Sequence, residues 1–314
     1  MKVARPTIGE AVDDPLKGIL LKLTAVVLFS AMVACIKATA PIVPAGEAVF
    51  FRSLFALPVI VVWLASQGHL RTGVRTARPW GHLVRGLVGT TAMGLGFAAT
   101  GLLPLPQLTA ISYATPILTV MLAILVLGEP IRAFRLVGVA LGLLGIGVVL
   151  WPDLAALRTE AGGVMAATGV MIALASALAY AIGALVTRSL TRTEATVTIV
   201  FWFTMSSTLI GLATLPIEAL GVWVFPGMEA FGLLMAAGLF GAFGQIALTS
   251  AFRAAHASTV APFEYASIFV AVVIGYAAFG EVPTAWTLAG AVVVIAGGIV
   301  IVRGERRGLV PRLV

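Results

Sequence analysis

The stretch LGEPIRAFRLVGVALGLLGIGVV (127–149) returns later in the chain as FGEVPTAWTLAGAVVVIAGGIVI (279–301). A shift of 152 residues aligns the two copies, and each places Gly-Glu directly after an apolar run. Tyr113 and Tyr265, each followed by alanine, are related by the same shift. The other matched positions are Ala133 with Ala285, Leu136 with Leu288, Gly138 with Gly290, Gly145 with Gly297 and Val148 with Val300. This pattern indicates an internal duplication.

The composition around these copies is that of a protein surrounded by lipid. The chain has 314 residues, of which 60% are hydrophobic and 11% are charged. Soluble domains average about 45–50% apolar and about 25% charged residues. The net charge of +7 does not indicate nucleic-acid binding, because the basic residues form short clusters between apolar runs. We therefore expect a membrane protein and no nucleic-acid partner.

Ten segments have the length and apolar character of spanning helices, which need about 17–25 residues. Proline and glycine interrupt the chain between them. The predicted segments are 17–39, 46–66, 84–103, 107–127, 135–151, 163–187, 195–216, 230–251, 258–279 and 285–302. The expected fold is an all-α integral membrane protein with ten transmembrane helices.

The basic residues predict the orientation of these helices. One side of the predicted membrane collects 17 of the 20 Lys and Arg residues, leaving Lys37, Arg52 and Arg158. Because cytoplasmic loops carry the excess of Lys and Arg, both termini are expected in the cytoplasm. The predicted tails are 1–16 and the basic 303–314, and the predicted location is a bacterial inner membrane.

The duplication divides the helices into two groups of five, at 17–151 and 163–302. An odd number of helices places the start of the second group on the opposite side of the membrane, so the repeats are inverted. Inverted repeats are typical of secondary transporters, whose substrate site lies near the membrane midplane between the repeats.

Three stretches carry a resemblance to a known family: GEAVFFRSLFALP (46–58), 115–149 and 261–302. Together with the ten-helix pattern they resemble the EamA-type drug/metabolite transporter superfamily over nearly all of 17–302. That resemblance implies transport of small organic solutes, by import or export. Within the family, FFRSLFALP and 82–116 are most similar to bacterial riboflavin-uptake carriers, and S-adenosylmethionine uptake carriers come next.

Glu264, within APFEYASIFV (261–270), is the first candidate for a functional residue. A charge inside the membrane costs about 2.5–3.5 kcal/mol, so such a residue normally faces an interior and has a task. Three roles are open to it, namely binding of substrate or a cation, proton transfer, and pairing with a neighbouring helix.

Arg52 is the second intramembrane charge, and its guanidinium stays ionised in proteins. A structural ion pair and a substrate contact are both open to it. Glu47 lies near the same helix end, where it is either functional or an interfacial residue that reaches water. Lys37 is expected to extend to the lipid headgroups. Glu129 and Glu281 are expected to be structural and to cap the helices that follow them.

Aromatic and amide side chains complete the candidate set. Tyr113 and Tyr265 occupy matching repeat positions, and each hydroxyl needs a partner. Trp202 is a candidate for stacking on a flat ring. Gln245, in an apolar run, either binds substrate or joins helices.

Motifs for catalysis and metal binding are missing from the sequence. The three histidines fall in or beside predicted cytoplasmic loops, and no metal-ligand spacing, nucleophile elbow or Walker loop is present. We expect no cofactor and no enzymatic activity. An intramembrane enzyme acting on lipid is the alternative from another class, and it lacks a visible catalytic cluster.

The sequence therefore predicts a secondary carrier that works by alternating access. Its first substrate candidate is riboflavin, and S-adenosylmethionine uptake and amino-acid or metabolite export are the alternatives. The expected partners are a small-molecule substrate and the lipid bilayer, and a homodimer is left open.

Overall fold

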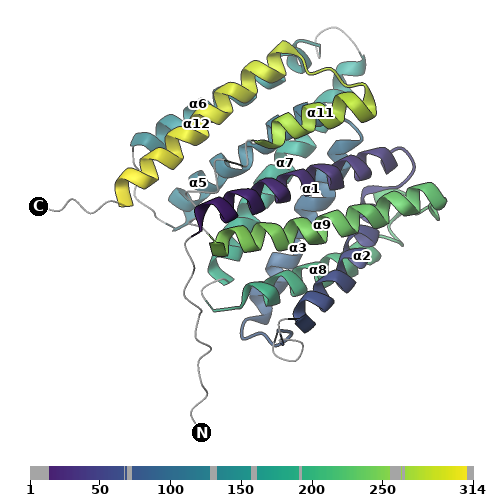
Figure 1. Ribbon diagram of the computed structural model, residues 1–314. Coiled ribbons are helices and arrows are strands. Elements are labelled where there is room, and N and C mark those ends of the chain that lie inside the picture. The colour runs from purple at the N-terminus through teal and green to yellow at the C-terminus, as the bar shows by residue number, and fades with distance from the viewer. Residues whose placement is uncertain are drawn as a thin grey trace, which may run out of the picture.

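The computed structural model describes residues 14–66, 68, 73–127, 133–156, 161–190, 193–254, 263 and 266–309, and these residues contain helices and no strand. The described residues fold into a bundle of helices (Figure 1). The helices are α1 (Pro15–Thr39), α2 (Ala45–Ser66), α3 (Pro79–Thr100), α4 (Leu105–Ser112), α5 (Ala114–Leu127), α6 (Ala133–Ala156), α7 (Ala161–Leu190), α8 (Thr196–Ala213), the 3-10 helix η1 (Glu218–Leu220), α9 (Met228–Ala254), α11 (Ser267–Phe279) and α12 (Ala285–Leu309).

Five helices, α1, α2, α3, α7 and α9, are long and apolar enough to cross a membrane, and α6, α8, α11 and α12 contain shorter apolar stretches. Large apolar side chains lie exposed on the outside of the bundle. Examples are Val62, Phe269 and Val292, which are 67%, 72% and 66% exposed. Exposure of such apolar faces to water is unfavourable, whereas contact with lipid is not. The prediction of ten spans goes beyond these helices and stays a prediction.

The predicted helix at 107–127 is broken in the structure. It consists of α4 and α5, which meet at a turn at Tyr113. Pro116 explains why the α-helical hydrogen bonds are interrupted here, because a proline has no amide hydrogen to donate to the carbonyl four residues earlier. In the first turn of a helix the backbone N–H groups have no partner within the helix, so a proline there loses no hydrogen bond. The expectation of one continuous helix is therefore wrong.

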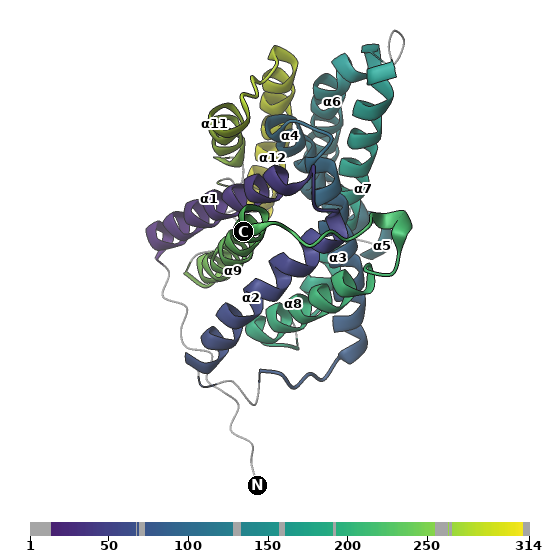
Figure 2. The same ribbon diagram turned by 90° about the vertical axis from the view of Figure 1, so that its right-hand side faces the viewer.

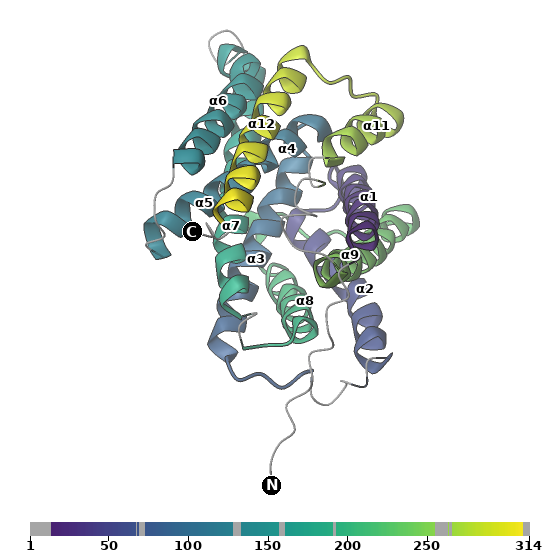
Figure 3. The same ribbon diagram turned by 60° about the vertical axis from the view of Figure 1, so that its left-hand side comes forward.

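Helices α6 and α12 lie side by side along most of their length (Figures 1 and 3). Glycines set the distance between these two helices. A Cβ atom added at Gly145 would lie 2.8 Å from the carbonyl oxygen of Gly290, and one added at Gly297 would lie 2.7 Å from that of Gly138. Such distances leave no room for a side chain. These glycines therefore serve close packing of the two helices.

The most extensive of the remaining contacts also join early helices to late ones. Helix α1 packs against α9, α3 packs against α7, and α2 packs against α8. Figure 2 shows α2 and α8 side by side at one end of the bundle, with α6 and α12 at the other. The interior of the bundle is thus built between the N-terminal and C-terminal halves of the chain.

Two carboxylates connect the halves in a reciprocal way. Glu47, in the first turn of α2, accepts a hydrogen bond from the amide of Val224 in the α8–α9 connection, at 3.0 Å. Glu194, just before α8, accepts bonds in the α2–α3 connection from the Thr76 hydroxyl at 2.7 Å and the Ala77 amide at 2.9 Å. Each half therefore uses a carboxylate at a helix start to hold a connection of the other half.

Lys37 and Glu281 form a third link. The Lys37 Nζ atom lies 2.9 Å from Glu281 Oε1 and donates to the carbonyl oxygens of Thr100 at 3.0 Å and Leu103 at 2.7 Å. Glu281 Oε2 accepts from the Leu105 amide at 2.8 Å. The expectation that Lys37 reaches the headgroups is wrong, because these acceptors hold its amine. Glu281 is structural as expected, but it caps α4 rather than α12. Its counterpart Glu129 lies outside the described residues.

Candidate functional site

Arg52 lies in the interior of the bundle, and its side chain is 6% exposed. It projects from α2 toward α9, where glycine leaves space for it. A Cβ atom at Gly241 would lie 2.7 Å from Arg52 Nη2 and 2.9 Å from the sulfur of Met32. The Arg52 Nε atom is buried and has no hydrogen-bond partner. A charged donor that stays unpaired in this position is costly, so it normally serves a purpose beyond packing.

Arg85 is a second interior arginine. It is the seventh residue of α3, which places its backbone about 9 Å along the helix at about 1.5 Å per residue. Its guanidinium carbon lies 4.2 Å from the centre of the Phe203 ring on α8. This distance is within the range of a cation–π interaction. The Nε and Nη1 atoms of Arg85 are buried and have no hydrogen-bond partner.

Tyr180, on α7, lies within electrostatic range of both Arg52 and Arg85. Its side chain is partly exposed, at 41%. Arg52, Arg85, Tyr180 and Phe203 are called the arginine site below.

Buried hydroxyl groups lie on the same helices. Thr90 of α3 and Ser207 of α8 share a hydrogen bond at 2.9 Å, and Ser176 of α7 donates to the carbonyl oxygen of Ala92 at 2.7 Å. Ser53, next to Arg52, is fully buried, and its hydroxyl has no partner. Polar groups therefore cluster where α2, α3, α7 and α8 meet, inside a protein whose other interior contacts are largely apolar.

Sequence reasoning found Arg52 and missed Arg85. Arg85 was only the second residue of the predicted third segment, 84–103, and it was counted with the basic residues of the cytoplasmic side. The structure starts α3 at Pro79, because proline is favourable in the first turn of a helix. A helix start at Pro79 was the signal in the sequence that would have moved Arg85 into the membrane. Tyr180 was one of many aromatics without a distinguishing feature.

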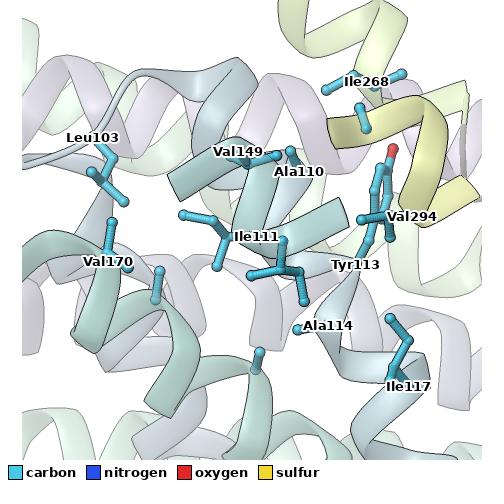
Figure 4. Close-up of a cluster of buried hydrophobic side chains, with 14 of the residues drawn as sticks. Leu103, Ala110, Ile111, Tyr113, Ala114, Ile117, Val149, Val170, Ile268 and Val294 are labelled. Carbon is cyan, nitrogen blue, oxygen red and sulfur yellow. The ribbon is translucent and has the colours of Figure 1, made fainter. Parts of the chain in front are cut away.

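Tyr113 lies at the break between α4 and α5, within the largest buried cluster. Figure 4 shows its ring beside Val294, with the hydroxyl oxygen directed toward the helix that carries Ile268. The hydroxyl shares a hydrogen bond of 2.7 Å with Ser267 at the start of α11. Ser267 lines a small hollow of about 170 Å³ between α1, α4 and α11, together with Ser30, Thr109 and Ser112. Tyr113 thus lies at the edge of a second polar region.

The other predicted residues have separate places. Glu47 is buried at the start of α2 and bonded to Val224, away from the arginine site. The Trp202 indole donates to the Val74 carbonyl oxygen at 3.1 Å, so it is held in the α2–α3 connection. Gln245 is half-buried on α9. Glu264 and Tyr265 lie outside the described residues, and the predictions for them stand as made.

A larger hollow of about 540 Å³ lies between α1 and α9 and is lined mainly by apolar side chains. Its lining includes Leu28, Phe240 and Phe243 but neither arginine, so it fits a lipid chain better than a polar solute. Within the described residues, no group of three His, Cys, Asp or Glu side chains is placed to hold a metal ion.

The apolar helices and their interior polar site define a multi-pass membrane protein of the small-molecule transporter class. The chain belongs to the EamA-like transporter family, whose profile matches residues 16–151 and again residues 167–303. A crystal structure that is 20% identical covers 94% of this chain and 100% of its own, with a TM-score of 0.64, so the two share a fold.

Three relatives cover most of the chain. A riboflavin transporter of Rhizobium johnstonii is 30% identical over 84% of this chain and 83% of its own length. An S-adenosylmethionine uptake transporter of Rickettsia prowazekii is 26% identical over 84% of each chain. A pseudopaline exporter of Pseudomonas aeruginosa is 31% identical over 92% of this chain and 97% of its own.

Proposed function

We propose that the protein is a secondary carrier that moves a small organic metabolite across a bacterial inner membrane by alternating access. The observation that carries this proposal is the composition of the arginine site. Arg52 and Arg85 come from the first family match, whereas Tyr180 and Phe203 come from the second. A site formed between two halves is the arrangement that rocking of one half against the other would expose alternately to each side.

In this proposal ten spans form two inverted five-helix repeats, at 17–151 and 163–302. The reciprocal bonds of Glu47 and Glu194 support it, because each lies at the start of a corresponding helix and holds the other half. Both termini are cytoplasmic in this arrangement. The exposed Arg75 and Arg78 of the α2–α3 connection then lie on the cytoplasmic side, as the positive-inside rule requires.

Riboflavin uptake is the first substrate to test, because both the sequence resemblance and a relative of that name favour it. S-adenosylmethionine uptake rests on a relative with similar coverage. Export rests on a relative that aligns over 92% of this chain and 97% of its own length. All three use the same proposed interior site, and they differ in the solute and in the direction of movement.

The test is uptake of labelled riboflavin and, in parallel, labelled S-adenosylmethionine by bacterial cells that cannot make or import the solute in question. Cells with the protein are compared with cells carrying an empty vector, over a range of solute concentrations. Saturable uptake that requires the protein establishes import and its substrate. If neither solute enters and neither leaves preloaded cells, although the protein is confirmed in the membrane, both substrate assignments fail.

A further inference from the structure

We infer that the arginine site binds an anionic group of the transported solute, a carboxylate or a phosphate, between the guanidinium groups of Arg52 and Arg85. This inference rests on the proposed carrier function and names the class of solute for it. It goes beyond the names of the relatives, which do not assign any residue of this chain to substrate binding.

Charge balance favours an anionic ligand. Two guanidinium groups stay ionised inside the bundle, where an unpaired charge is costly. Among the described residues, the acidic side chains with ion-pair contacts are Glu281, which pairs with Lys37, and Glu194, which lies 3.8 Å from His82. Neither of these contacts involves Arg52 or Arg85. A bound anion would therefore supply the negative charge that the described part of the site lacks.

The hydrogen-bond capacity of the two guanidinium groups also favours an anion. Arg52 Nε, Arg85 Nε and Arg85 Nη1 are buried donors without partners. A guanidinium presents its N–H groups in a planar fork that matches two oxygens of a carboxylate or phosphate. An uncharged carbonyl or hydroxyl accepts fewer of these bonds and leaves both charges uncompensated. The free donors therefore favour an anionic group over a neutral one.

Packing also restrains both guanidinium groups. The Phe203 ring centre lies 4.2 Å from the guanidinium carbon of Arg85, within cation–π distance. Gly241 and Gly89 provide the space that each guanidinium occupies, since a Cβ at either glycine would collide with an arginine. Tyr180 is the remaining polar side chain of the site, and 41% of its surface is exposed.

This inference ranks the candidate substrates. Riboflavin is uncharged near neutral pH and leaves both arginines without a counter-ion. S-adenosylmethionine carries a carboxylate, and exported metabolites commonly do. The arginine site thus favours a carboxylate- or phosphate-bearing solute over riboflavin.

The test needs no prior choice of solute. A bacterial host expressing the wild-type chain is compared with an empty-vector host by untargeted mass spectrometry of cytosol and medium. Solutes whose distribution changes are the transported ones, and we expect them to carry a carboxylate or phosphate. Transport of each is then measured in R52Q and R85Q, with R75Q as the matched control, because Arg75 is an exposed arginine outside the site.

We expect R52Q and R85Q to raise the half-saturating concentration about tenfold or more, since each removes charged hydrogen bonds to the ligand. R75Q should behave as wild type, and the methyl ester of a carboxylate solute should no longer compete. If R52Q or R85Q does not reach the membrane, R52K and Y180F replace it, and both should weaken binding without loss of protein.

Two results overturn the inference and leave the carrier standing: transported solutes without an anionic group, or wild-type affinity in the arginine variants that reach the membrane. A different result removes the proposed function itself. If wild-type protein in the membrane changes the distribution of no solute, there is no carrier activity, and the inference falls with it.

Discussion

Gly145 of α6 and Gly290 of α12 face each other so closely that a Cβ on either would lie 2.6–2.8 Å from the carbonyl oxygen of the other. Gly138 and Gly297 form a second contact of this kind. The repeat shift converts one pair into the other, since it aligns Gly138 with Gly290 and Gly145 with Gly297. A two-fold relation between the two copies produces this exchange.

Substitution G145A should therefore separate α6 from α12. The new methyl group cannot fit against the α12 backbone, and overpacking of this kind costs about 1–3 kcal/mol. The measurement is the thermal unfolding midpoint of the purified protein in detergent. Gly147 is the matched control on the same helix, because nothing lies within 4 Å of its Cβ position. G147A should be neutral or stabilising, since alanine favours helix. Equal behaviour of the two variants would contradict the close contact.

The pair of Lys37 and Glu281 should show strong coupling. Both side chains are largely buried, at 13% and 16% exposed, so K37M and E281Q each leave a partner without its counter-charge. Each single change should lower stability by about 3 kcal/mol, at the lower end of the range for a buried pair. The double variant should lose much less than the sum, which a double-mutant cycle measures. Additive losses would show that the pair does not act as a unit.

Stability should depend on pH through Glu194. Burial alone would raise the pKa of this carboxyl, but hydrogen bonds from Thr76, Ala77 and Arg78, with nearby His82, outweigh burial and lower the pKa below its ordinary value. A carboxyl with a lowered folded-state pKa stabilises the fold above its unfolded pKa, about 4.3, and loses this contribution as the pH falls through the folded value.

E194Q should therefore melt below wild type at pH 7, and the difference should shrink below about pH 4. Glutamine is a close control in shape, because it keeps an acceptor oxygen and loses the charge. The measurement is the melting temperature of both proteins from pH 3 to 7. A difference that stays constant or grows as the pH falls would contradict the assigned pKa shift.

Tyr180 should be reachable from both sides of the membrane if the halves rock around the arginine site. The chain has a single cysteine, Cys35, so C35S provides a background without thiols. In that background, Y180C should react with a membrane-impermeant maleimide in right-side-out and in inside-out vesicles. V292C, at an exposed apolar position of α12, should stay unlabelled in lipid. Labelling of Y180C from one side only would argue against alternating access.

The sequence predicted most of the helices and the duplication because both depend on local composition and spacing. The bounds of α2 and α7 match their apolar runs closely, and glycines that the repeat shift aligns lie where α6 and α12 touch. These features are visible in the chain because small and apolar residues recur at fixed intervals.

Partners that depend on tertiary structure could not be predicted. The sequence around Lys37 does not indicate that Glu281, far along the chain, lies 2.9 Å from its amine. Arg85 was misplaced for a different reason, because a hydropathy window begins at the first long apolar run, whereas α3 begins at Pro79. The arginine site thus emerges only when helices from both halves are assembled.

Counterflow in proteoliposomes tests the carrier account most directly. Vesicles containing the purified protein are loaded with the unlabelled solute that the cell assays identify and then diluted into a trace of its labelled form. A carrier that alternates between two states releases unlabelled solute outside the vesicle and returns with labelled solute. The account therefore predicts that labelled solute accumulates transiently inside the vesicles above its equilibrium level. This accumulation should be strongly reduced in R52Q. Simple equilibration without an overshoot, at the same rate in loaded and empty vesicles, would contradict it.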